Sequence, residues 1–340
     1  MKYLIIDASN TFFRARHAAS KHADTWDRLG FAIHVTIGAI AKCWRDNQAD
    51  HVVFCLEGRS WRKDFYAPYK ANRAVKRAAL TEAEAEEDQL FWDAYDDLKT
   101  FIIEKSNCTV LQHPKLEADD LVAGWIQAHP NDEHVIISSD SDFYQLLSEN
   151  VSQYNGIADE HHTIKGIFDK KGAPIIDKKT KLPKTIPDPK WILFEKCMRG
   201  DSSDNVFSAY PGVRTKGSKN KVGLQEAFED KGKKGFNWNN LMLQTWVDHN
   251  GAEHRVLDDY LRNVTLIDLT AQPDDVKLHI AETIATNSVP KDVSQVGVHF
   301  MKFCGKYDMK KMAESPKMYT DFLSKRYPEE LVTYDVLRTP

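Results

Sequence analysis

Short apolar runs alternate with longer segments of helical periodicity along the first half of the chain. The runs cover residues 2–6, 51–56 and 134–139, with a shorter one at Thr109–Leu111. Apolar positions recur at helical spacing through residues 81–106, a segment that begins with acids and ends with a lysine, as suits the helix dipole. This alternation is typical of a parallel α/β sheet, so we expect strands at the four runs and a helix over 81–106.

The pattern changes in the second half. Residues 165–190 hold eight lysines and no sustained apolar period, which predicts an exposed basic hairpin or loop. From Pro189 the pattern is helical again, and a basic, glycine-containing turn at 211–223 is followed by more helix. The second part of the chain is therefore predicted to be mostly α-helical.

The composition mainly excludes certain classes of protein. The chain has 340 residues, 42% hydrophobic and 28% charged, enough for a real core and about two domains. No run approaches the roughly 20 apolar residues of a membrane helix, and Asp7 interrupts the start before a signal-peptide core could form. We therefore expect a cytoplasmic protein with no membrane partner. Five cysteines without a CxxC pair predict reduced thiols rather than disulfides or a zinc ribbon.

Acidic residues stand where the predicted strands end and where one helix begins. Because the carboxyl ends of parallel strands form one edge of a sheet, we expect these acids to converge there. Taken singly, each also fits an ordinary role as a helix cap, a turn residue or a solvated strand end. In chain order they are Asp7, Glu57, Glu117, Asp119, Asp120, Asp140 and Asp142.

Taken together, such a group predicts a metal site. Carboxylates gathered within a few ångströms raise one another's pKa unless a cation neutralises them. Oxygen ligands without a neighbouring cysteine or paired histidine favour Mg²⁺ or Mn²⁺ over zinc. Two such ions about 4 Å apart can activate a water and stabilise the leaving oxygen of a phosphodiester. Hydrolysis of nucleic acid is therefore our hypothesis.

Two further acids, Asp201 and Asp204, lie in the second part of the chain. Their spacing of three places both carboxylates on one side if this segment is helical. The alternative is a helix that ends at Gly200 and is followed by a capping acid.

Basic and aromatic residues alternate between residues 59 and 77. Such interleaving suits a single strand of nucleic acid, and the alternative is a solvated basic face. The basic residues are Arg59, Arg62, Lys63, Lys70, Arg73, Lys76 and Arg77, and the aromatic ones are Trp61, Phe65, Tyr66 and Tyr69.

Five motifs in this order resemble the flap endonuclease or 5′-nuclease superfamily, most of all its phage 5′→3′ exonucleases and the 5′-nuclease domain of bacterial DNA polymerase I. Residues 262–268 also resemble the family's late helical region, so the resemblance covers residues 1 to 315. The motifs are Ile6-Asp7, Tyr69-Lys70-Ala71-Asn72-Arg73, Glu117-Ala118-Asp119-Asp120, Ser139-Asp140-Ser141-Asp142 and Gly200-Asp201-Ser202-Ser203-Asp204-Asn205.

The resemblance implies an α/β fold with a PIN-like parallel-sheet nuclease domain at residues 1–188, in which residues 60–106 form a helical arch. The segment 81–106 would form part of that arch or pack behind it. A mostly helical domain with a helix-hairpin-helix element for duplex DNA would follow at 189–315. The role of residues 316–340 is open between a partner-binding tail and a helix packed on the core.

The resemblance also implies roles for individual residues. All the acids named above would be metal ligands or would support them, with Glu57 standing where the family more often has Asp. Lys70 and Arg73 would be catalytic cations that neutralise charge on the scissile phosphate. Tyr69 would stack on a terminal or unpaired base.

A second group of residues would bind DNA without reading its sequence. Residues 211–221 resemble the helix-hairpin-helix turn that grips duplex backbone, often with a potassium ion, although this copy is longer and its second glycine is displaced. The DNA-binding residues implied are Arg59, Arg62, Lys63, Lys76, Arg77, Gly212, Arg214, Lys216, Lys219 and Lys221.

The net charge of −4 does not oppose a DNA partner, because without the nine site acids the rest of the chain carries +5. We expect a monomeric, Mg²⁺- or Mn²⁺-dependent 5′→3′ exonuclease or flap endonuclease. It would use two ions on DNA 5′ ends, flaps and duplex junctions and leave 5′-phosphates. A phage origin would place it in the host cytoplasm. The alternatives are a nuclease acting on RNA or RNA-DNA hybrids, and an inactive structure-specific DNA-binding protein.

Overall fold

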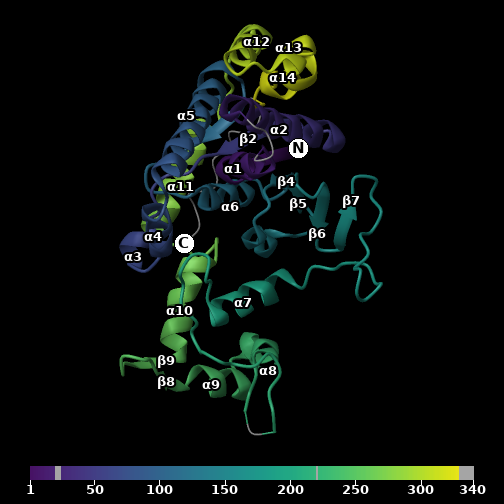
Figure 1. Ribbon diagram of the computed structural model, residues 1–340. Helices are drawn as coiled ribbons and strands as arrows, with labels where there is room; N and C mark the ends of the chain where they lie inside the picture. Colours follow the sequence, from purple (N-terminus) through teal and green to yellow (C-terminus); the bar gives the residue numbers. More distant parts are fainter. Residues whose placement is uncertain (20–23, 220, 329–340) are drawn as a thin grey trace. The chain divides into compact units, whose positions relative to one another are not determined.

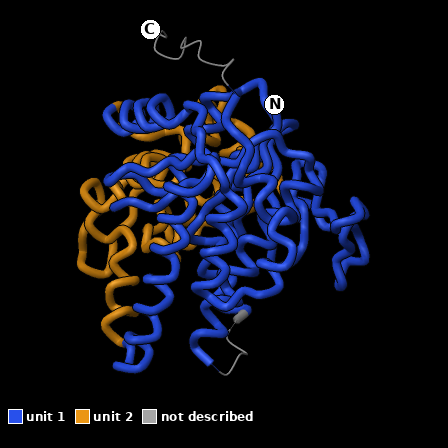
Figure 2. The backbone as a smooth tube through the Cα atoms, turned by 90° about the horizontal axis from the view of Figure 1, so that it is seen from above, with its two compact units in different colours: residues 1–59, 80–186, 275–340 blue, residues 60–79, 187–274 orange. Residues whose placement is uncertain are grey.

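The structure, a computed structural model, describes residues 1–19, 24–219 and 221–328. They form two compact units, coloured separately in Figure 2: unit 1 holds residues 1–59, 80–186 and those from 275 onward, and unit 2 holds 60–79 and 187–274. Unit 1 contains β1 (Lys2–Asp7), α1 (Ala8–Ala19), α2 (Thr25–Asn47), β2 (His51–Cys55), α5 (Glu82–Lys105), β3 (Thr109–Leu111), α6 (Ala118–Ala128), β4 (Glu133–Ile137), the 3₁₀ helix η1 (Ser141–Leu146), β5 (Val151–Asn155), β6 (Glu160–Thr163), β7 (Gly166–Asp169), α11 (Asp274–Asn287), α12 (Val296–Lys306), α13 (Lys310–Glu314) and α14 (Lys317–Ser324). Unit 2 contains α3 (Arg62–Phe65), α4 (Ala71–Ala78), α7 (Pro189–Arg199), α8 (Leu224–Asp230), the 3₁₀ helix η2 (Lys231–Lys233), α9 (Phe236–Met242), β8 (Thr245–Val247), β9 (Glu253–Arg255) and α10 (Val256–Ile267).

Unit 1 is built around a seven-stranded sheet in the order β3-β2-β1-β4-β5-β6-β7. The strands from β3 to β5 in that order pair in parallel, and β6 and β7 add antiparallel strands at one edge. The strand order reverses between β1 and β4, the kind of position at which open α/β sheets bind ligands. The predicted α/β class and all four predicted strands are confirmed.

Helices cover both faces of this sheet (Figure 1). Successive residues of a strand point to opposite faces. Leu4 and Ile6 of β1 therefore enter the core shared with α1, α2 and α5, whereas Tyr3 meets Trp125 of α6 edge-on, with ring centroids 5.2 Å apart. The predicted helix over 81–106 is α5, and it buries Phe91, Ala94, Tyr95, Leu98, Phe101 and Ile102.

The C-terminal helices belong to unit 1. Phe101 of α5 stacks on Phe303 of α12 at 4.7 Å, and Phe322 of α14 is buried in the same core. The compact units therefore do not follow the expected boundaries, because α12 packs on α5 within unit 1 and residues 60–79 group with 187–274. Of the expected tail, residues 317–324 form a helix packed on the core, while residues 329–340 lie outside the described part of the chain.

Unit 2 is mostly helical, as the pattern predicted. Its core joins Phe194 and Met198 of α7 to Leu224 of α8, Trp238 of α9 and Tyr260 of α10. The chain between α7 and α8 carries the predicted basic turn, which gives a helix, a loop and a second helix.

The five cysteines, all among the described residues, are buried and unpaired. Within the part of the chain that the structure describes, no helix is long and apolar enough to cross a membrane.

Candidate active site

Asp7 ends β1 and lies at the point where the strand order reverses. It is 4% exposed, and its Oδ1 accepts a hydrogen bond from the backbone N–H of Asn10 at 3.2 Å. Its Oδ2 accepts from the Ser138 hydroxyl at 2.9 Å, and the same Ser138 oxygen accepts from the backbone N–H of Asp140 at 3.0 Å. Ser138 directly follows β4, so one hydroxyl connects the acids at the ends of the two strands that flank the reversal.

Uncharged polar residues complete this connection, and sequence reasoning missed them. Oδ1 of Asn10 accepts from the backbone N–H of Ser139 at 3.0 Å and from its hydroxyl at 2.9 Å. Gln153 of β5, which is buried, donates through Nε2 to the carbonyl oxygens of Ser138 at 2.8 Å and Asp140 at 2.7 Å. The sequence signal available for Asn10 was its position three residues after Asp7, the acid that ends β1.

Glu57 reaches the start of α6 because the chain makes a close approach after β2. The backbone N–H of Gly58 donates to the carbonyl oxygen of Leu116 at 2.8 Å, and a Cβ on Gly58 would lie 2.1 Å from the carbonyl oxygen of His113. Only glycine fits there. The exposed Glu57 then accepts from the backbone N–H of Ala118 at 3.2 Å.

The acids that open α6 also cap it. Asp120, fully buried, accepts from the backbone N–H of Glu117 at 3.2 Å, and Glu117 completes the capping box in return. Asp140 likewise accepts from the backbone N–H of Asp142 at 3.0 Å. The ordinary capping and turn roles are therefore present. A carboxylate has two oxygens, so a capping bond and a metal bond can coexist.

The charges of three acids act on one buried side chain. Burial of Cys55 raises the pKa of its thiol, and the charges of Asp7, Asp119 and Glu57 raise it further. Burial likewise raises the pKa of Tyr95, followed by the charges of Asp7 and Glu57. Carboxylates from β1, the end of β2 and the start of α6 thus concentrate negative charge in one place. This all-oxygen set suits a hard divalent cation.

In unit 2, the segment from Pro68 to Arg73 is tied to the loop that follows α7. The backbone N–H of Lys70 donates to the carbonyl oxygen of Asp204 at 2.8 Å, and Nδ2 of Asn205 donates to the carbonyl oxygen of Pro68 at 2.8 Å. Lys70 has a φ of 54°, in the left-handed region that costs a non-glycine residue free energy. Two motifs far apart in sequence therefore form one local structure.

Asp204 is the centre of that structure. Its Oδ2 accepts from the Tyr69 hydroxyl at 2.9 Å and lies 3.5 Å from Nζ of Lys70, and its Oδ1 lies 2.8 Å from the Arg73 guanidinium. The two expected catalytic cations thus share one carboxylate as counter-ion.

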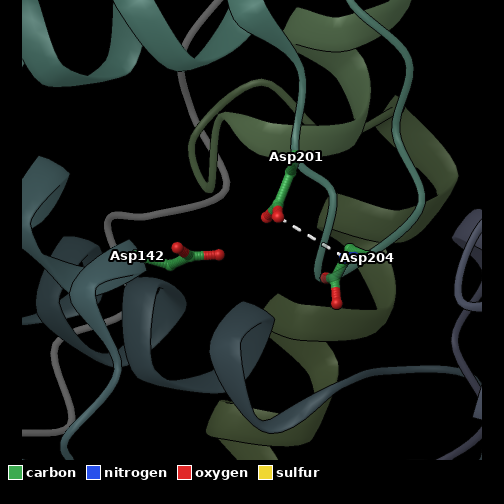
Figure 3. A group of neighbouring side chains, drawn as sticks. All are labelled: Asp142, Asp201 and Asp204. Carbon is green, nitrogen blue, oxygen red and sulfur yellow. Dashed lines mark hydrogen bonds between the residues drawn. The ribbon is translucent and has the colours of Figure 1, made fainter.

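Asp201 lies on the same turn as Asp204, whose backbone N–H donates to Oδ1 of Asp201 at 3.4 Å (Figure 3). Burial acts to raise the pKa of Asp201, but Lys196, whose Nζ is 2.8 Å away, and the donors of Ser203 outweigh it and hold the pKa below its usual value. Asp142, also drawn in Figure 3, belongs to unit 1.

The segment that carries Asp201 and Asp204 is a turn, so the helical spacing considered from sequence is wrong. Asp201 and Val206 form a bridge that closes the turn, and α7 ends before Gly200, as the alternative held. Gly200 has a φ of 76°, and a Cβ there would lie 2.3 Å from the carbonyl oxygen of Val206. The chain can fold back only at a glycine.

Two expected roles need correction. Tyr69 is 4% exposed and its ring belongs to the core of unit 2, so it has no face to offer a base. Arg62 is 1% exposed, and its Nε donates to the carbonyl oxygen of Leu266 at 2.8 Å. It is a buried structural residue, not a DNA contact. Of the interleaved aromatic residues, Trp61 is buried as well, and Phe65 is the one that is half exposed.

The remaining expected DNA-binding residues lie at the surface: Arg59, Lys63, Lys76, Arg77, Gly212, Arg214, Lys216, Lys219 and Lys221. Asn220, within the turn at 211–221, lies outside the described residues. The turn is closed by Glu226 of α8, whose carboxylate accepts from the backbone N–H groups of Gly217 and Gly223, each at 3.0 Å. Because the N–H groups of Gly217 and Gly223 donate to Glu226, a phosphate bound at this turn would contact other N–H groups or side chains of the turn.

Residues 2–173 match the family model described as 5′-3′ exonuclease, N-terminal resolvase-like domain. The chain is 28% identical to DNA polymerase I of Rhizobium leguminosarum over 238 residues, which are 66% of this chain and 20% of that protein. It is 26% identical over 231 residues to flap endonuclease Xni of Shewanella piezotolerans, covering 67% of this chain and 77% of that protein.

A solved structure of the T5 5′-exonuclease, described with divalent metal ions (zinc) bound, matches with a TM-score of 0.58 at 21% identity, covering 84% of this chain and 99% of that one. This similarity establishes a shared fold.

Proposed function

The chain belongs to the 5′-3′ exonuclease family with the N-terminal resolvase-like domain, and on that basis we propose that it is a divalent-metal-dependent 5′→3′ exonuclease and flap endonuclease. Its substrate is DNA with a 5′ end, a flap or a junction of duplex and single strand, and its products carry 5′-phosphates. The names of the relatives, a flap endonuclease and a DNA polymerase I, support DNA as the substrate class.

One observation carries the proposal: acids gather at the edge of the sheet where the strand order reverses, because Ser138 links Asp7 to Asp140 and Glu57 accepts from the backbone N–H of Ala118, between Glu117 and Asp119. Like charges held close together repel, and such a group persists when a cation or hydrogen-bond donors offset the repulsion. The donors to Asp7 from Asn10 and Ser138 fix where its oxygens point.

The acids at the strand ends and at the start of α6 would hold divalent cations, and the family resemblance implies a part in metal binding for Asp201 and Asp204 as well. Bound Mg²⁺ or Mn²⁺ would lower the pKa of a water and stabilise charge on the phosphate oxygens, the chemistry of two-metal phosphodiester hydrolysis. The metal-bound T5 relative supports the use of divalent ions.

Lys70 and Arg73 would supply positive charge to the scissile phosphate as water attacks. Asp204 balances both cations before substrate binds and holds them close together. Tyr69 orients Asp204 from within the core and is a positioning residue.

The exposed basic loop at 211–221 would hold the duplex backbone through phosphate contacts. Helix α4 has no buried residue, and the first turns of α5 are exposed as well. We assign these surfaces to the arch that would admit a 5′ strand.

The test is cleavage of a 5′-labelled flap and a plain duplex, each with Mg²⁺ and with EDTA. Metal-dependent release of short 5′ fragments is expected, and Asp142→Ala should reduce the rate by at least about a thousandfold while duplex binding remains. Asp275→Ala, a change of the same size at an exposed position of α11, is the control and should cleave as the wild type does. Turnover of Asp142→Ala within about tenfold of the wild type would contradict the two-metal assignment.

A further inference from the structure

A basic segment that includes β7 and the turns after it lies at the edge of the sheet in unit 1 (Figure 1). Residues 165–184, the lysine arm, contain seven lysines, two aspartates and no other charged residue. The arm therefore carries a net charge of +5 within a chain whose net charge is −4. The predicted exposed basic hairpin is confirmed, and none of the proposed catalytic residues lies in it.

The arm presents its lysines on two turns with the same local sequence, Asp-Lys-Lys. In the first, Oδ1 of Asp169 accepts from the backbone N–H groups of Lys171 at 2.8 Å and Ala173 at 2.9 Å. In the second, Oδ1 of Asp177 accepts from those of Lys179 at 2.9 Å and Thr180 at 2.7 Å. Each turn thereby carries a pair of adjacent exposed lysines: Lys170 with Lys171, and Lys178 with Lys179.

Backbone hydrogen bonds hold the two turns in a fixed arrangement. The N–H of Ile175 donates to the carbonyl oxygen of Ile167 at 2.9 Å, and the N–H of Lys184 donates to that of Ile175 at 2.7 Å. The N–H of Asp177 donates to the carbonyl oxygen of Leu182 at 2.8 Å. Because the backbone is already ordered, a ligand that binds the lysines has less conformational entropy to offset.

The positive charge of the arm is not cancelled locally. The two acids of the arm, Asp169 and Asp177, use their carboxylates to close the turns. Hydrogen bonds from backbone N–H groups lower the pKa of each. Across residues 1–19, 24–219 and 221–328, the arm's one ion pair joins Lys165 to Glu149 at 3.2 Å. The four lysines of the turns are therefore available to an external anion.

We propose that the lysine arm binds the phosphate backbone of double-stranded DNA outside the catalytic site. The choice of DNA as the polyanion rests on the proposed function. Lysine is a compact charge suited to a phosphate, and two lysine pairs on fixed turns can contact more than one phosphate of a duplex backbone. The arm has one aromatic residue, Phe168, and no arginine, so it lacks the stacking platform that a single strand uses.

The test compares two full-length variants with the same loss of charge. The arm variant replaces Lys170, Lys171, Lys178 and Lys179 by Gln. The control variant replaces Lys302, Lys310, Lys311 and Lys317, which are also exposed in unit 1, by Gln. Fluorescence anisotropy with a labelled blunt duplex and with the matching single strand, in EDTA at several NaCl concentrations, gives each Kd and its salt dependence.

The arm variant should bind duplex at least about tenfold more weakly, with a log Kd versus log [NaCl] slope smaller by about 0.9 for each phosphate that a lysine no longer neutralises. The control variant should bind like the wild type. Equal weakening in both variants, no weakening in the arm variant, or a larger loss of affinity for the single strand would overturn the proposal. Because no step requires cleavage, a wild type that binds but does not cleave would refute the proposed function and leave this inference standing.

Discussion

The Tyr69 hydroxyl lies 2.9 Å from Oδ2 of Asp204, a contact between residues 135 positions apart in the sequence. Tyr69 belongs to a core, whereas Asp204 is the shared counter-ion of Lys70 and Arg73. The packing of unit 2 is thus coupled through one hydrogen bond to the position of two cations. Removing that hydrogen bond should therefore change the cleavage rate more than it changes the free energy of unfolding.

Tyr69→Phe should therefore lower the single-turnover cleavage rate several-fold while the Kd for a flap substrate stays near the wild-type value. The ring keeps its place, so the free energy of unfolding should fall by only about 1 kcal/mol, as for the loss of one hydrogen bond. Urea denaturation and rapid-quench kinetics measure the two effects. A drop in affinity with an unchanged rate would show that Tyr69 does not act through Asp204 on catalysis.

Under the proposed function, Lys70→Ala should reduce the single-turnover rate by about 100-fold or more, because it removes a positive charge that would offset the charge on the scissile phosphate. The Lys70 side chain is 9% exposed and its backbone is left-handed, whereas the Arg73 side chain is 59% exposed. Lys70→Arg should rescue poorly, since a planar guanidinium does not reproduce the compact charge of an ammonium group 3.5 Å from Asp204.

The comparison of rate and affinity decides the role of Lys70. A loss concentrated in Kd, with a nearly normal rate at saturating enzyme, would make Lys70 an ordinary phosphate contact. Lys325→Ala, at an exposed position of unit 1, provides the control for removing one lysine and should match the wild type in both measurements.

Gly200→Ala should destabilise the protein by about 2 to 4 kcal/mol, because the new Cβ meets a carbonyl oxygen and the left-handed backbone adds strain. The turn that carries Asp201 and Asp204 should shift, so cleavage should fall as well. Gly305→Ala is the matched control: Gly305 lies in α12 with nothing within 4 Å of the added Cβ. It should leave stability unchanged or raise it by up to about 1 kcal/mol. Equal stability of the two variants would contradict the steric argument.

The free energy of unfolding should decrease below about pH 6.5. His51 is fully buried, and its Nε2 accepts from the backbone N–H of Thr109 at 3.2 Å. Burial, the largest influence, lowers the pKa of His51 from 6.5 to about 4. The unfolded chain therefore takes up a proton first as the pH falls, and stability is lost between about pH 6.5 and pH 4. This residue contributes a slope of up to about 1.4 kcal/mol per pH unit.

His51→Phe should flatten that dependence in urea denaturation series at several pH values. The dependence should not vanish, because burial also lowers the pKa of His129 and of His134. His249→Gln, at an exposed position, should keep the wild-type slope. An unchanged slope in His51→Phe would assign the pH effect to other groups.

The sequence by itself determined the α/β class, the four parallel strands, α5 and the acids at the strand ends. These features follow from local regularities: strand runs, helical periodicity and the rule that parallel strands end at one edge. The order of the motifs also determined the family. Motif residues such as Asp7 and Asp140 stand at fixed positions relative to their strands, so they can be recognised along the chain. The exposure of the lysine arm was also predictable from the sequence, because it follows from the local lysine content and the lack of an apolar period.

The tertiary structure alone decided what depends on contacts between distant segments. It placed Tyr69 and Arg62 in the interior, although both read from sequence as nucleic-acid contacts, because burial depends on which apolar surfaces meet and not on residue type. It also made Asp204 the counter-ion of Lys70 and Arg73 and brought in Ser138 as the link between two strand ends. No local pattern encodes such pairings, because each arises only when packing brings together chain segments that are far apart in sequence.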